Sequence, residues 1–203
     1  MRFIFIACLI LASSVIQAKE TFVVCYNFTC RSEWVVVFND REWRFIDAIF
    51  SPAADTPEQE RQQIMHGIKW MEEFVGRYTP THRDLARNYT KFNDNLDDDV
   101  GQLDCIDESL NTTTYLKAFE QRKLLRYHQV MDRAMRRAFW NQHWAGRVQE
   151  KESGDTYIVD SWFRDNGEFP YVLSEASWQD LSVSGRNSKS KKGANLLTVL
   201  SEK

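Results

Sequence analysis

The stretch Gln102-Leu103-Asp104-Cys105-Ile106-Asp107-Glu108-Ser109 holds a single cysteine in acidic, loop-like sequence. The residues that follow place apolar side chains at helical spacing, so we predict a helix that begins at Cys105. Unpaired N–H groups and the dipole at a helix N-terminus favour negative charge. This position therefore favours the thiolate form of Cys105, which is the nucleophilic form of a cysteine.

Two later segments carry a histidine and an aspartate that fit this chemistry. Residues 143–150 and 156–163 have the pattern of two strands joined by a glycine-containing turn, which predicts a β-hairpin. Neighbouring strands allow the side chains of His143 and Asp160 to face each other. Trp144, the next residue along the strand, then points to the opposite face.

These residues predict a catalytic triad of Cys105, His143 and Asp160. A histidine beside a thiol accepts its proton, and a carboxylate behind the histidine fixes the imidazole tautomer. His128 is a rival base, because it is closer to Cys105 in the sequence, although no carboxylate is evident behind it. Each triad member also has a purely structural interpretation: a small buried apolar residue, a core histidine, or a polar residue before a buried segment.

The N-terminus has the pattern of a secretory signal peptide over residues 1–18. A short basic start is followed by about ten apolar residues and a small residue before Lys19. That apolar run is too short to cross a bilayer, which needs about 20 residues. We therefore expect a periplasmic or secreted protein with no membrane insertion after signal cleavage.

Export would allow the cysteines to form disulfides, because disulfides persist outside the cytoplasm. Cys25 and Cys30 lie close together and predict a small disulfide loop, which leaves Cys105 unpaired. The alternative is a disulfide between Cys105 and one of the other two. No pair of cysteines has the C-x-x-C spacing typical of zinc sites, and we expect neither a metal nor a cofactor.

The remaining chain predicts a mixed fold. Trp34–Phe38 has the pattern of a buried strand, and Thr56 and Pro57 begin a helix that ends near Gly76. Residues 78–101 have the polar composition of a long loop, and the pattern of residues 126–141 fits either a helix or a strand. Helices come first and strands later, which is typical of the α+β class.

One domain over residues 19–183 and a disordered basic tail over residues 184–203 complete the predicted organisation. A formal net charge of −3 does not provide the excess of positive charge that is typical of nucleic-acid-binding proteins. We expect a monomer that acts on a peptide or protein substrate.

The spacing of the three candidate residues resembles the transglutaminase-like superfamily of papain-fold thiol enzymes. Cys105 is followed by His143 after 38 residues and by Asp160 after a further 17, and the resemblance covers about residues 100–165. The sequence departs from the family around the cysteine, where glycine and tryptophan are frequent and Gln102-Leu103-Asp104 stands here.

The resemblance implies a papain/transglutaminase-like fold, with the nucleophile at a helix N-terminus packed on an antiparallel sheet. It also implies acyl transfer, in which the thiolate attacks an amide and the acyl group passes to water or to an amine. The oxyanion would be bound by the backbone N–H of Cys105 and a second donor, for which Gln102 is the candidate.

Two other functions fit the sequence. A cell-wall peptidase of the NlpC type also has a cysteine at a helix start, and it predicts a third polar residue soon after the histidine, here Gln149 or Glu150. An exported binding domain of the same fold with an idle site is the second, with aromatic residues lining a peptide or glycan groove.

Overall fold

The computed structural model describes residues 20–89, 100–138 and 141–181. The predicted signal peptide and basic tail lie outside these residues. The elements in chain order are β1 (Thr21–Tyr26), β2 (Ser32–Val37), α1 (Asp40–Ile49), α2 (Pro57–Val75), the 3₁₀ turn η1 (Pro80–Arg83), α3 (Cys105–Gln121), β3 (His128–Ala138), β4 (Asn141–Glu150), β5 (Thr156–Asp160), β6 (Tyr171–Ser174) and α4 (Glu175–Gln179).

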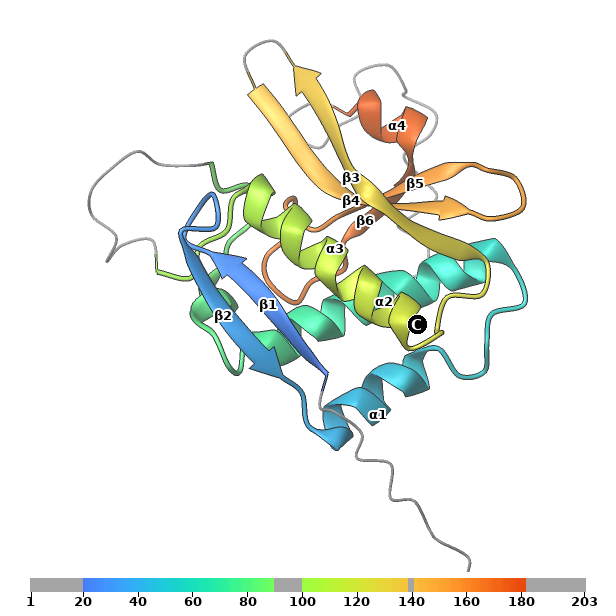
Figure 1. The fold of residues 1–203 in the computed structure, drawn as a ribbon. Helices are drawn as coiled ribbons and strands as arrows, with labels where there is room; N and C mark the ends of the chain where they lie inside the picture. The colour runs from blue at the N-terminus through green and yellow to red at the C-terminus, as the bar shows by residue number, and fades with distance from the viewer. Residues whose placement is uncertain (1–19, 90–99, 139–140, 182–203) are drawn as a thin grey trace, which may run out of the picture.

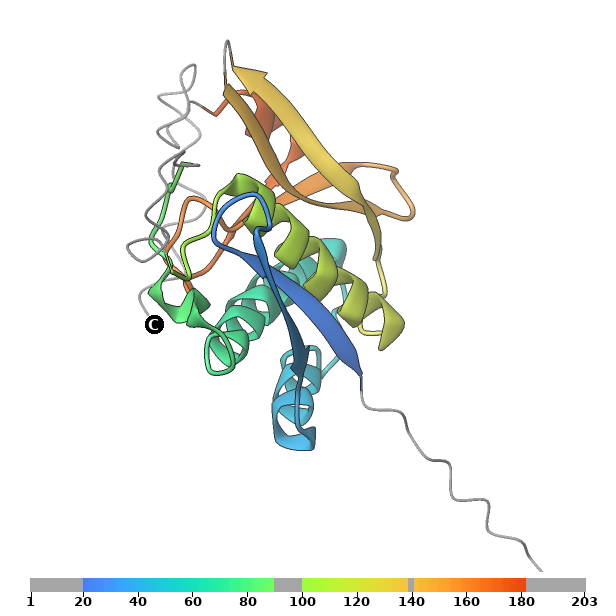
Figure 2. The ribbon, with the colours of Figure 1, turned by 60° about the vertical axis from the view of Figure 1, so that its left-hand side comes forward.

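The fold is α+β, as the sequence predicted, and α3 is its central element. β1 and β2 form an antiparallel hairpin, and β3-β4-β5-β6 form an antiparallel sheet in that order. Figure 1 shows α3 between the hairpin and the four-stranded sheet, with α4 beyond the sheet. In Figure 2, α1 lies at the end of the molecule far from the sheet.

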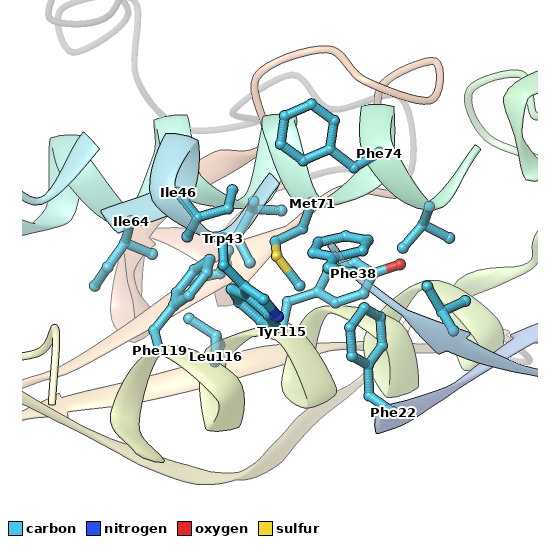
Figure 3. Packing of buried hydrophobic residues seen from close by; sticks show 14 of the residues in the cluster. Phe22, Phe38, Trp43, Ile46, Ile64, Met71, Phe74, Tyr115, Leu116 and Phe119 are labelled. Carbon is cyan, nitrogen blue, oxygen red and sulfur yellow. The ribbon is translucent and has the colours of Figure 1, made fainter. Parts of the chain in front are cut away.

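The main core fills the space between α2, α3, α1 and the hairpin (Figure 3). Apolar side chains of all four elements meet there, among them Phe22, Phe38, Trp43, Ile46, Ile64, Met71, Phe74, Tyr115, Leu116 and Phe119. Burial of each such large side chain contributes about 1.5–3 kcal/mol. The core therefore fixes α3, and with it Cys105, against the rest of the chain.

A smaller cluster covers the other face of the sheet. Trp178 of α4 packs there on Ala134, Ala145 and Ile158. The sheet is thus buried on both faces, by α3 on one and by α4 on the other. None of the helices among the described residues is both long enough and apolar enough to span a membrane.

Local signals placed α2 correctly and left residues 126–141 unresolved. Thr56 caps α2 with its hydroxyl oxygen 3.2 Å from the Gln59 nitrogen, and Pro57 stands at the first helical position, as predicted. Of the segment 126–141, which fitted either structure, residues 128–138 form β3, and Asn141 is the first residue of β4. Strand β2 exists, but Trp34 and Val35 are 51% and 60% exposed, because a two-stranded hairpin leaves one face open.

The predicted disulfide between Cys25 and Cys30 is present, and Cys105 is free. It closes a loop in which four consecutive residues, 27–30, have φ between 54° and 66°. Left-handed backbone is costly for residues with a side chain. Hydrogen bonds from α3 support it, because Asp104 accepts from the Thr29 nitrogen at 3.1 Å and Asp107 from the Cys30 nitrogen at 2.6 Å.

We predict that replacing both Cys25 and Cys30 by serine lowers the free energy of unfolding by about 2 kcal/mol, because a short covalent loop is lost. Urea denaturation followed by circular dichroism measures this change. Cys105→Ser is the matched control, since that cysteine is unbonded. An unchanged unfolding midpoint in the double variant would show that the hydrogen bonds to α3 hold the loop without the disulfide.

Candidate functional site

Cys105 is the first residue of α3, in a helix terminus with a complete capping box. The Asp104 carboxylate accepts hydrogen bonds from the Ile106 and Asp107 nitrogens at 2.9 and 3.1 Å. The Asp107 carboxylate accepts in return from the Asp104 nitrogen at 3.3 Å. The helix therefore begins where the sequence predicted, and its first turn is held on both sides of the cysteine.

His143 of β4 and Asp160 of β5, which the predicted hairpin allowed to face each other, are in direct contact. The His143 Nε2 and Asp160 Oδ2 atoms are 2.7 Å apart, and Trp178 Nε1 donates to the same oxygen at 2.6 Å. The imidazole lies among aromatic rings, with the centroids of Trp162 and Trp178 at 4.7 and 5.6 Å. The bond through Nε2 leaves Nδ1 without a hydrogen-bond partner among the described residues, so this nitrogen remains available to a thiol.

Cys105 contacts β4 on either side of His143. Its sulfur lies 3.8 Å from the Gln142 carbonyl oxygen, and the backbone N–H of Trp144 donates toward it. Within the described segments, this part of β4 pairs with no strand on that edge, because pairing with β5 begins only at Gly146. The structure thus brings the three predicted residues to one place.

Within the described residues, the thiol makes no hydrogen bond to the imidazole. The alternation of β4 explains this arrangement. Ala145, on the same face as His143, packs under α4, whereas a side chain at Gly146 would meet α3. His143 therefore approaches the site from the face of the sheet away from α3, and the thiol has to turn from the Gln142 carbonyl to reach it.

The pKa of Cys105 differs from the sequence-based expectation. The pKa of this thiol is raised from 9.0 to about 11, chiefly by burial and also by the nearby carboxylates of Asp104 and Asp160. The Trp144 N–H and the backbone N–H of Cys105 act in the opposite direction but do not outweigh them. In this arrangement the thiol is protonated at neutral pH.

Gln102 is oriented toward the loop that precedes the site. Its side-chain nitrogen donates to the Arg83 carbonyl, and its side-chain oxygen accepts from Asn88 and from the Leu85 nitrogen. One N–H of this amide is thereby engaged. Its role as an oxyanion donor stays a prediction.

The rival base, His128, lies elsewhere and does have a carboxylate partner. Its Nδ1 is 2.9 Å from Glu60 Oε1, and its side chain is fully buried. Glu60 also accepts from the backbone nitrogens of residues 126–128, so the pair anchors the start of β3. Gln149 and Glu150 lie at the other end of β4 from His143, where Gln149 bonds to Gln129 and Glu150 to Arg61.

Beneath the first turns of α3 lies a cluster of buried carboxyl groups that the sequence analysis missed. Burial raises the pKa values of Glu72, Asp84 and Asp107 to about 7, and that of Glu108 well above its usual range. Asp84 and Glu108 share a hydrogen bond. Lys69 partly offsets the effect of burial on Glu72. A sequence signal existed, because Glu72 stands four residues after Ile68 on the apolar face of α2.

Metal binding has little support in the described part of the chain. One group of three potential ligands is close enough together there, Cys25, Cys30 and Asp107. Both sulfurs are bonded to each other in the disulfide, so they cannot also serve as thiolate ligands.

Comparison with known proteins yields no relative: no protein-family model, no curated sequence and no solved structure matches this chain.

The carboxyl cluster predicts a pH-dependent stability. Because the folded-state pKa values are raised, these groups stabilise the fold at pH values below their unfolded pKa of about 4. That contribution is lost as the pH rises through about 7. We expect the melting temperature to fall by at least about 3 °C between pH 5 and pH 8, which corresponds to one pKa unit at one site.

Glu108→Gln should weaken this pH dependence, because the amide cannot ionise. The matched control is Glu152→Gln, which changes an exposed carboxylate in a turn. Differential scanning calorimetry at a series of pH values measures both. A melting temperature that rises from pH 5 to pH 8 in the unmodified protein would contradict the buried cluster.

Proposed function

We propose that this chain is an exported thiol enzyme of the papain/transglutaminase-like type, which cleaves or transfers an amide or peptide bond. The observation that carries the proposal is the His143–Asp160 hydrogen bond on a strand whose backbone contacts Cys105 on both sides of the histidine. A cysteine at a helix start and a carboxylate-held histidine are the two parts that thiol acyl transfer requires.

The reaction begins with a proton transfer. The Cys105 S–H turns from the Gln142 carbonyl to His143 Nδ1, which accepts the proton as the sulfur attacks the substrate carbonyl carbon. Asp160 stabilises the imidazolium through Nε2, and the Trp178 N–H holds the carboxylate in place. Removal of a positioned general base typically lowers rates by about 10²–10⁴-fold.

The collapse of the tetrahedral intermediate completes the first half of the reaction, the acylation of Cys105. The imidazolium returns its proton to the leaving amine, the C–N bond breaks, and a thioester on Cys105 remains. The oxyanion is stabilised by the backbone N–H of Cys105 at the start of α3, where the helix dipole adds to the effect. Water or an amine then attacks the thioester, and its proton passes to His143.

The disulfide supports the predicted location. Structural disulfides persist in oxidising compartments such as the periplasm or the extracellular space. Since the Cys25–Cys30 loop contacts Asp104 and Asp107, beside the nucleophile, the same compartment would protect both the fold and the site. The substrate class we propose is a peptide or protein.

One observation favours a catalytically idle binding domain as the second candidate. The pKa of Cys105 is raised by burial and by nearby carboxylates, whereas a nucleophilic cysteine is commonly held at a lowered pKa. The thiol also faces a backbone carbonyl rather than the imidazole. A thiol that never turns to His143 would leave the fold intact and the site inactive.

Acylation by p-nitrophenyl acetate, followed by intact-protein mass spectrometry, separates the two candidates. We expect one acyl group on Cys105 and at least about tenfold slower acylation in His143→Ala and Asp160→Asn. Cys105→Ser gives the background from other nucleophiles, and His82→Ala is the matched histidine control, since that residue lies in η1. Equal rates in the unmodified protein and in His143→Ala would favour the idle site.

A further inference from the structure

A half-open cavity of about 320 Å³, with a mixed polar and apolar lining, lies along α3, on the face of the sheet opposite His143. It opens between α3 and the β3–β4 strand pair. Its polar lining comes from Thr113, Thr114 and Lys117 of α3 and from Asp132 and Arg133 of β3. Leu110 and Trp144 supply its apolar lining. Trp144 also links this cavity to the candidate site, because its backbone N–H donates toward the Cys105 sulfur.

A buried hydroxyl beside this cavity lacks a hydrogen-bond partner. Thr113 is 8% exposed, and its Oγ1 makes no hydrogen bond within the structure. A buried polar atom left unpaired destabilises a protein unless something satisfies it. Thr113 lines the cavity, but protein atoms cover its Oγ1, so a ligand in the cavity contacts other atoms of this residue.

The cavity is rich in hydrogen-bond donors and positive charge. The Arg133 guanidinium lies 4.9 Å from the centre of the Trp144 ring and donates to Ser109 Oγ at 3.0 Å. Its other N–H groups have no hydrogen-bond partner among the residues that the structure describes, and a ligand could accept from them. Lys117 is exposed at the rim. Against these two cations stands one carboxylate, Asp132, which is itself exposed.

The cavity lies at a defined distance from the nucleophile. Thr113 follows Cys105 by eight residues on the same helix, which corresponds to about 12 Å along the axis. An extended peptide advances about 3.3 Å per residue. A substrate chain that runs along α3 from Cys105 would therefore place a side chain in the cavity three to four residues from the reacting bond.

We propose that this cavity binds a carboxylate of the substrate, and so selects acyl substrates that carry an acidic group three to four residues from the bond attacked by Cys105. The Arg133 guanidinium donates to the carboxylate, and Lys117 adds charge. Its role as a substrate subsite rests on the proposed function, whereas the binding of a carboxylate does not.

The test is peptide binding to the full-length Cys105→Ser protein, which removes turnover from the measurement. Acetylated alanine hexapeptide amides with one glutamate, and the same peptides with glutamine, are titrated by isothermal titration calorimetry. We expect the glutamate peptides to bind about tenfold more tightly, as hydrogen bonds to a charged group allow. A third set, with glutamine and a free C-terminal carboxylate, tells a chain terminus from an acidic side chain as the source of the carboxylate.

Two variants tie the preference to the cavity. In Arg133→Gln and Lys117→Gln we expect most of the tenfold preference to be lost. Lys117 is exposed, so Lys117→Gln should not lower the melting temperature. Lys123→Gln, at an exposed lysine beyond the end of α3, is the matched control and should keep the preference.

Equal affinity for glutamate, glutamine and free-carboxylate peptides would overturn the carboxylate site, as would a preference that both variants retain. These outcomes leave the proposed function untouched, because acylation of Cys105 is measured separately. Conversely, carboxylate binding together with an unreactive Cys105 would disprove the enzyme and leave a binding domain with a defined ligand chemistry.

Discussion

The carboxyl groups of Asp104 and Asp107 hold the start of α3, on which both the fold and the candidate site depend. Each caps the first turn of α3, and each also accepts a backbone N–H from the disulfide loop. The same two side chains thus fix the start of the helix, the left-handed backbone of residues 27–30 and the position of Cys105. Substitution of either residue would therefore affect both the fold and the candidate site.

This arrangement puts the stability of the helix start in conflict with the reactivity of the thiol. A helix N-terminus favours an anion, but Asp104 already supplies one there, and Asp160 supplies a second. Both carboxylates, together with burial, favour the protonated thiol. Catalysis by Cys105 would therefore rely on His143 as a base during the attack rather than on a thiolate formed in advance. The cluster around Glu72 and Glu108 also has raised pKa values, so its groups are protonated under acidic conditions.

The sequence predicted those features that depend on local patterns. The start of α3 at Cys105, the β4–β5 hairpin and the Cys25–Cys30 disulfide follow from spacing and from residue type. Features that depend on tertiary packing were missed. The carboxyl cluster joins α2, η1 and α3, and the face of β4 on which His143 lies is set by α4. The lowered pKa expected for Cys105 was wrong for the same reason, because residues distant in the sequence bury the thiol and surround it with negative charge.

The most direct test of the central claim is the pH dependence of Cys105 alkylation by iodoacetamide in the folded protein, with and without His143→Ala. A thiol that turns to His143 should react with a midpoint below about 9, and the variant should move that midpoint upward, because the histidine no longer stabilises the thiolate. A midpoint near the value of about 11 given by the present arrangement, unchanged in the variant, would contradict the account. The thiol would then be a buried structural group, and the chain would be a binding domain.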